Sequence, residues 1–246
     1  MNYREFQKTM NSSGEAICKE VFLENQDAIR IKKEKTAVKN FKKIFDAVFQ
    51  ITYEKGFQAM SMRDLSSKTA MSMGALYGYF KSKEELLAII QKQGRTMIQR
   101  VLETFFHESD DPVTRLRHLI KAHLFLSEAA RPWFYFTFME ARNLSPAALE
   151  SVISLEEYTE DILVTILEQG EAQGLFIQRD HRLTASIIKS MQQDWYLKRW
   201  KYTKRDISVD YYADYVLEVI ERFCLSPEAI ERRTSPEPGQ AGIIAS

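Results

Sequence analysis

Glycine and proline are scarce in this sequence, with 9 and 6 copies in 246 residues. That is too few turn residues for an all-β protein with many hairpins. The longest clean apolar run covers only residues 86–90, too short to span a bilayer. Residues 1–30 have scattered charges and no apolar core, so we expect no secretory signal. The only cysteines, Cys18 and Cys224, form no metal-binding spacing, and we expect a reduced, cytoplasmic chain.

Motifs of the common enzyme classes are also missing. The sequence contains no GxSxG, GxxxxGK[ST], HExxH or CxxC pattern. His118 and His123 are five residues apart, off a common helix face, and no histidine follows a glutamate at the spacing of di-iron bundles. We interpret the acidic cluster at 156–161 as a solvated helix face. We therefore expect no enzyme activity, no cofactor and no metal site.

Net charge is zero, but the charges are unevenly distributed. Residues 30–83 contain twelve Lys and Arg against four Asp and Glu, whereas both flanking segments are net acidic. This asymmetry predicts a small module that binds a polyanion, attached to a larger body. On charge alone, a solvated basic face is the alternative.

Within the basic segment, the pattern predicts one longer helix followed by two short ones. Apolar residues at helical spacing define the first, which Gly56 ends: Phe41, Ile44, Phe45, Val48 and Thr52. Capping patterns open short helices at Ser61 and Ser72 and a long helix at Ser82. The two short helices, joined by a tight turn, indicate a helix-turn-helix unit whose second helix, expected through Phe80, enters the major groove of DNA.

The stretch SMRDLSSKTAMSMGALYGYFKSKEELL (Ser61–Leu87) resembles the N-terminal domain of TetR/AcrR-family transcriptional regulators. The resemblance extends over about 47 residues from Phe41. It implies an all-α fold, with a three-helix helix-turn-helix DNA-binding domain and a larger helical domain for effector binding and dimerisation. We expect a partly flexible extension over 1–34, the DNA-binding domain over 35–82, the larger domain over 83–225, and a mobile tail over 226–246.

The resemblance also implies roles for individual residues. Arg63 matches a base-reading position, Tyr77 and Lys83 match phosphate-contacting positions, and Ser61 and Tyr79 approach the DNA backbone. The expected contact set is Ser61, Arg63, Ser72, Met73, Gly74, Ala75, Tyr77, Gly78, Tyr79, Lys81 and Lys83. The sequence departs from the family pattern at 73, 75 and 78, so no recognition-helix residue before Lys81 can make bidentate base contacts. Arg63, methyl contacts from Met73 and Ala75 to thymine, and DNA shape should then carry specificity.

Two neighbouring features have alternative interpretations. Gly78 is unfavourable in a helix, and either a close approach to a phosphate or neutral drift explains it. The basic run Arg30–Lys35, with Lys39, is either an arm in the minor groove or a solvated extension.

Beyond residue 110, apolar periodicity predicts helices over 113–128, 132–143, 146–172, 181–200 and 208–224. Aromatic side chains gather at 119–139 and 191–202. They either fill the core or surround a pocket for the small hydrophobic effectors to which members of the family respond. The expected pocket lining is Met97, His123, Phe125, Trp133, Phe136, Met139, Glu140 and Trp195.

The last two predicted helices have apolar faces at three-to-four spacing: Ile187, Met191, Tyr212, Tyr215, Val216, Val219 and Phe223. The resemblance implies that these faces form a four-helix bundle across a two-fold axis, although they could also serve only the core. The expected function is a homodimeric repressor, with no membrane partner, that a small hydrophobic effector releases from a palindromic operator. An acyl-CoA, a fatty acid or an aromatic compound would suit. The alternative is an interaction or DNA-coating protein with the same fold.

Overall fold

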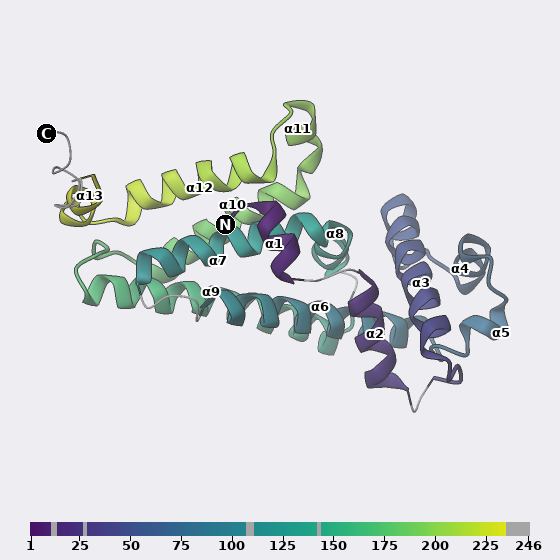
Figure 1. Cartoon of the computed structure of the whole chain (residues 1–246). Coiled ribbons are helices and arrows are strands. Elements are labelled where there is room, and N and C mark those ends of the chain that lie inside the picture. The colour runs from purple at the N-terminus through teal and green to yellow at the C-terminus, as the bar shows by residue number, and fades with distance from the viewer. Residues whose placement is uncertain (11–13, 27–28, 107–110, 142–143, 235–246) are drawn as a thin grey trace, which may run out of the picture.

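A computed structural model describes the chain except for residues 11–13, 27–28, 107–110, 142–143 and 235–246 (Figure 1). Its helices are α1 (Tyr3–Met10), α2 (Gly14–Asn25), α3 (Glu34–Lys55), α4 (Met62–Thr69), α5 (Met73–Leu76), α6 (Lys83–Phe106), α7 (Pro112–Ala129), α8 (Arg131–Glu140), α9 (Pro146–Ala172), α10 (His181–Leu197), α11 (Arg199–Lys204), α12 (Val209–Cys224) and α13 (Pro227–Thr234). The described residues contain no β-strand, so the predicted all-α fold is confirmed. None of the helices described is both long and apolar enough to cross a membrane.

Helices α3, α4 and α5 form a small head at one end of the molecule (Figure 1). The head core is built from the apolar face of α3, including Phe41, Ile44 and Val48, which are fully buried. Leu65 of α4 and Leu76 of α5 are also fully buried. Because α5 is a single turn, its stability depends on this packing rather than on helix propensity.

Helices α6–α12 form the body, and α7 lies at its centre, packed against α6, α9, α10 and α12. Pro112 starts α7, and the side chain of Asp111 accepts a hydrogen bond from the Thr114 N–H at 2.9 Å. Helix α6 connects head and body: Leu86 and Leu87 are buried near its start, and Val101 and Leu102 are buried further along it. One continuous helix therefore packs in both parts of the molecule.

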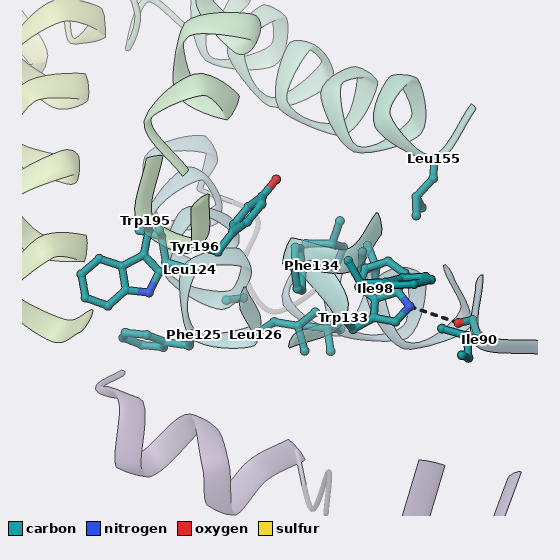
Figure 2. Close-up of a cluster of buried hydrophobic side chains, with 14 of the residues drawn as sticks. Ile90, Ile98, Leu124, Phe125, Leu126, Trp133, Phe134, Leu155, Trp195 and Tyr196 are labelled. Atoms are coloured by element: carbon teal, nitrogen blue, oxygen red, sulfur yellow. Dashed lines mark hydrogen bonds between the residues drawn. The ribbon is translucent and has the colours of Figure 1, made fainter. Parts of the chain in front are cut away.

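A close contact between α6 and α8 depends on Gly94. The Trp133 indole Nε1 donates a hydrogen bond to the Ile90 carbonyl at 3.0 Å (Figure 2). A Cβ atom on Gly94 would lie 1.8–2.2 Å from atoms of the Trp133 ring. Only glycine leaves room for the indole here, so this residue seats Trp133 in the body core.

Both ends of the chain contain helices. The expected 1–34 extension contains α1 and α2. The prediction of a mobile tail is wrong for its first part, because α13 covers Pro227–Thr234 and Ala229 is buried. The Ser226 hydroxyl donates to the Gly174 carbonyl at 2.8 Å and accepts from the Ala229 N–H at 3.1 Å, so Pro227 begins a helix instead of ending the fold. The remaining tail residues, 235–246, lie outside the described part.

Candidate DNA-binding face and effector cavity

The start of α4 is fixed by the predicted capping box. The Ser61 N–H donates to Asp64 Oδ2 at 2.7 Å, and the Asp64 N–H donates to Ser61 Oγ at 3.2 Å. A hydrogen bond from Lys55, 2.8 Å away, together with those from Ser61, holds the pKa of Asp64 well below its usual range. This network orients the first turn of α4, where Arg63 is exposed.

Helix α5 is shorter than predicted. Ser72 caps it, with the Ala75 N–H donating to Ser72 Oγ at 3.2 Å, but it ends at Leu76 rather than at Phe80. The next residues form a tighter turn, because the Gly78 N–H bonds to the Ala75 carbonyl at 3.1 Å, three residues back. Phe80 is buried as expected and anchors the end of this turn.

Most of the predicted DNA-contacting residues are accessible on the surface of the helix-turn-helix unit. The side chains of Arg63, Tyr77 and Lys81 are exposed, and Met73 is half-buried. The remaining accessible positions are Ser61, Ser72, Gly74 and Ala75.

Three members of the predicted set are engaged inside the head. Tyr79 is 3% exposed, packs edge-on against Phe41, and its hydroxyl accepts a hydrogen bond from Asn40 at 2.7 Å. The ring therefore belongs to the head core, and its burial raises the pKa of the Tyr79 hydroxyl. The Lys83 ammonium already donates to three carbonyls, at 3.0–3.3 Å, in the loop after α3: those of Phe57, Gln58 and Met60. It holds that loop against the start of α6.

Gly78, the third member, is buried against the segment that precedes α3. The Arg30 N–H donates to the Gly78 carbonyl at 2.9 Å, and a Cβ atom on Gly78 would lie 2.8 Å from Ile31 Cδ1. Close packing of Ile31 is thus a reason for glycine that neither sequence-based explanation included. The hydrogen bond of Arg30 places the start of the basic run beside the end of α5. The side chains of Arg30, Lys35 and Lys39 are exposed.

A cavity of about 70 Å³ lies in the body between α6, α7, α8, α9 and α10. Its walls are mainly apolar, and its lining includes Ile98, Trp133, Phe134, Phe138, Val152, Leu155 and Tyr196. Figure 2 shows Phe134 between Trp133 and Tyr196, and its ring centroid lies 5.2 and 5.1 Å from theirs. Polar side chains also reach this cavity: His123, Thr137, Glu156, Thr159 and Lys189.

A buried ammonium organises the polar side of the cavity. Lys189 Nζ lies 2.7 Å from Thr159 Oγ1, 3.3 Å from Glu156 Oε2 and 3.5 Å from His123 Nε2. Burial lowers the pKa of Lys189, and the carboxylate of Glu156 opposes this shift. Burial and the nearby Lys189 charge hold the pKa of His123 well below its usual value. Since an ammonium only donates, His123 Nε2 accepts, and the proton of the neutral ring lies on Nδ1.

Three polar atoms near this cluster lack a hydrogen-bond partner among the described residues: His123 Nδ1, Thr137 Oγ1 and Gln192 Oε1. His123 is only 4% exposed. A buried donor without an acceptor costs about 1–3 kcal/mol, so such a group commonly has a ligand or water as its partner. No cluster of three or more His, Cys, Asp or Glu side chains in the described part of the chain could hold a metal ion.

The predicted pocket residues separate into different places. His123 and Trp133 line the central cavity, while Met97 and Trp133 line a second cavity between the head and the body. Phe136 lines a cleft of about 620 Å³ between α3 and helices α8, α10 and α11. Phe125 and Trp195 are fully buried in the core, Met139 is exposed, and Glu140 is buried near Gly56.

Lys189, the cation of the cavity, was not predicted from the sequence, and Glu156 of the acidic cluster is less solvated than expected. Lys189 lies four residues after buried Ala185 and three before buried Gln192, on the inward face of α10. Its helical register was the available signal. Glu156, interpreted as solvated, is half-exposed and pairs with Lys189. Which helix faces α10 is not written in the local pattern, so the pair could not be predicted.

Some of the predicted dimer residues are exposed and others are buried in the body. Exposed apolar side chains lie on α10 and along one face of α12: Leu183, Ile187, Tyr211, Tyr215, Val219 and Phe223. Leu183 and Tyr211 were not predicted. Val216 is buried, and Tyr212 packs on Trp195 with its hydroxyl donating to the Met191 carbonyl at 2.7 Å. Because α7 and α10 occupy the inner side of α12, these residues belong to the core of one subunit.

Comparisons with known proteins agree with both parts of the molecule. Residues 44–90 match the family model of bacterial regulatory proteins of the tetR family, and residues 109–220 match the tetracyclin repressor-like C-terminal domain. An uncharacterised HTH-type transcriptional regulator of Lactococcus lactis is 25% identical over 154 residues, which cover 61% of this chain and 78% of the relative.

Solved structures share the fold. The TetR-family regulator PfmR of Thermus thermophilus aligns with a TM-score of 0.66 and 29% identity, over 74% of this chain and 98% of PfmR. AibR, solved with isovaleryl coenzyme A and operator DNA, aligns with a TM-score of 0.63 and 20% identity, over 73% of this chain and 96% of AibR.

Proposed function

Because this chain belongs to the TetR family of transcriptional regulators, we propose that it is a repressor that binds a palindromic operator as a homodimer. A small hydrophobic effector would bind in the body and release the DNA. One observation carries the proposal: Arg63, Tyr77 and Lys81 are exposed around a helix-turn-helix unit whose buried residues hold it rigid. A regulator of this kind would act in the cytoplasm, where bacterial DNA lies.

On the DNA face, Arg63 is the best candidate for base recognition. A guanidinium can make a bidentate contact with guanine. Gly74 and Ala75, on the exposed part of α5, carry no group that could make such a contact. These let the helix backbone approach the groove closely. Lys81 and the exposed cations of the basic run are suited to phosphate contacts, which give affinity but little sequence preference.

The exposed apolar face on α10 and α12 supports dimerisation. Tyr211, Tyr215, Val219 and Phe223 recur every four residues along α12, which makes one continuous stripe. Contiguous exposed apolar surface of this kind marks an interaction site. Two copies joined through this face would present two heads to two half-sites of a palindrome.

The cavity favours an effector with an apolar body and a neutral hydrogen-bond acceptor. The His123 Nδ1–H and the Thr137 hydroxyl can each donate a hydrogen bond to a ligand. The three N–H donors of Lys189 already have acceptors. A carbonyl therefore suits the site better than a free carboxylate, which would add a negative charge beside Glu156. The acyl group of a short acyl-CoA fits this description, and AibR was solved with such a compound.

A two-step experiment tests this function. DNA duplexes would be selected from a random library with purified protein, and the dissociation constant measured by fluorescence anisotropy. We expect selection of an inverted repeat, and release by isovaleryl coenzyme A at lower concentrations than by isovalerate. Thr137→Val, which removes the hydroxyl but keeps the shape, should weaken release, while Thr104→Val on the exposed face of α6 should not.

Binding to all duplexes alike would instead support a DNA-coating protein. Selection of an inverted repeat without release by any acyl or aromatic compound would support an interaction protein without a small effector.

A further inference from the structure

The N-terminal residues contact both the body and the end of α5. They precede residue 44, where the family model for the helix-turn-helix begins. Helix α1 lies on the body: Phe6 is fully buried, and its ring centroid lies 5.9 Å from that of Phe105 and 5.8 Å from that of Phe125. The Tyr3 N–H donates to Asp210 Oδ1 of α12 at 2.7 Å. One short helix thus contacts α6, α7 and α12.

Helix α2 lies between body and head, where it packs along α3 (Figure 1). Its side chains Cys18, Val21 and Phe22 are buried. Ion pairs fasten it to α6, with Glu20 and Arg100 2.5 Å apart and Glu24 and Lys92 2.8 Å apart. Since α6 is the helix that leads out of the head, α2 braces the junction from the side.

The segment after α2 reaches α5. Ile29 is 1% exposed, the Arg30 N–H binds the Gly78 carbonyl, and Ile31 packs where Gly78 lacks a side chain. These contacts hold the turn that ends α5. The same part of the chain therefore touches the candidate dimer helix α12 at one end and the candidate recognition helix at the other.

We propose that Tyr3–Met10, Gly14–Asn25 and Ile29–Ile31 form a strap that positions the recognition helix relative to the body. Ile31 and Gly78 are then positioning residues for DNA binding, and Phe6 is the remote anchor. The inference rests on the proposed function, because it requires that α5 enter the groove. A dimer binds two half-sites only when both heads are held at the matching spacing, so a loosened strap lowers operator affinity.

A remote anchor is tested with two matched variants. Phe6→Ala and Phe176→Ala each remove a buried phenyl group from the body, but only Phe6 belongs to the strap. Both should lower the thermal midpoint. Well below both midpoints, and with the dimer checked by gel filtration, Phe6→Ala should weaken binding to the selected duplex about fivefold or more. Phe176→Ala should leave the dissociation constant unchanged.

The contact at α5 is tested by a double-mutant cycle. Gly78→Ala places a methyl group against Ile31 Cδ1 and should weaken binding to the same duplex. Ile31→Ala vacates that space, so the double variant should bind more tightly than Gly78→Ala alone. A Cβ atom on Gly78 would also lie 3.1 Å from the Ala75 carbonyl oxygen, so we expect the rescue to be partial. No rescue at all would mean that Gly78 does not serve the packing of Ile31, which overturns this part of the strap.

The outcomes separate the two proposals. If the wild-type protein selects no duplex, the proposed DNA-binding function fails. If it selects one, and Phe6→Ala binds that duplex as tightly as wild type, the strap is only a stabilising cover and the inference fails while the function stands.

Discussion

Head and body carry their candidate functional residues in opposite ways. On the head, Arg63, Tyr77 and Lys81 are exposed, and the buried residues below them only hold the helices in place. In the body, His123 and Lys189 are 4% and 5% exposed and meet at a cavity formed by five helices. An exposed residue keeps the chemistry of its own side chain, whereas a buried one takes its pKa and tautomer from its neighbours.

The same comparison applies to a buried glycine of the body and an exposed glycine of the head. Substitution of the buried one gives the largest expected effect on stability. Gly94→Ala would drive a methyl group into the Trp133 ring, and it should lower the free energy of unfolding by about 3 kcal/mol. Gly74→Ala lies on the exposed face of α5, where the described residues place no neighbouring atom within 4 Å of the new Cβ. It should be neutral or stabilise by up to about 1 kcal/mol. Denaturant unfolding of both variants measures the contrast. Equal losses would mean that the Trp133 contact is not as described.

Exposed cations on the head should differ in what they contribute. Arg63→Ala should cost about 1–3 kcal/mol at a preferred base and flatten the discrimination among duplexes. Lys81→Ala should weaken all duplexes alike and reduce the slope of log affinity against log salt by about one. Competition binding at several salt concentrations checks both. Unchanged sequence preference in Arg63→Ala would assign base recognition to α5 instead.

Lys83, the first residue of α6, sharpens the comparison, because it belongs to the predicted DNA-contacting set but behaves as a structural residue. The resemblance implies a phosphate contact, whereas the ammonium already has three carbonyl acceptors. Lys83→Ala should therefore lower stability by about 1 kcal/mol and leave the salt slope of DNA binding unchanged. If Lys83→Ala reduced the salt slope by about one, as expected for Lys81→Ala, Lys83 would be a phosphate contact after all.

A similarly small effect, which depends on pH, is expected at Asp194 in the body. Burial alone would raise the pKa of its carboxyl, but hydrogen bonds from Lys198, Lys201 and Tyr202 outweigh burial and lower it to about 2. The stabilisation is present above the unfolded pKa of about 4 and is lost as the pH falls towards 2. Asp194→Asn should be less stable than wild type by about 1 kcal/mol at neutral pH, and this difference should shrink across that range. Thermal unfolding between pH 6 and 2.5 tests it, and a constant difference would contradict it.

The predictions from sequence succeeded where local rules decide the outcome. Helix α9 begins and ends at the predicted residues, because Ser145 and Pro146 mark its start. The capping box at Ser61 was predicted for the same reason. The length of α5 was overestimated, because its last turn follows the packing of Gly78 against Ile31, a contact between segments 47 residues apart.

Within the body, the sequence pattern predicts which residues are buried better than it predicts which of them face a cavity. Aromatic and apolar patterns correctly indicated buried helices, but they did not say which buried side chains face a cavity. Trp133 lines it, whereas Phe125 and Trp195 fill the core. Likewise, Val216 and Val219 are three residues apart on α12, yet one is buried and the other exposed.

By itself, the sequence determined the helical class and the helix-turn-helix unit, because caps, periodicity and charge act within a few turns of chain. Only the tertiary structure decided that Lys189 meets His123, that Lys83 binds a loop, and that α1 contacts the body while Arg30 binds the turn after α5. Those contacts join distant segments. Their free energy depends on which surfaces meet, and no local pattern records that choice.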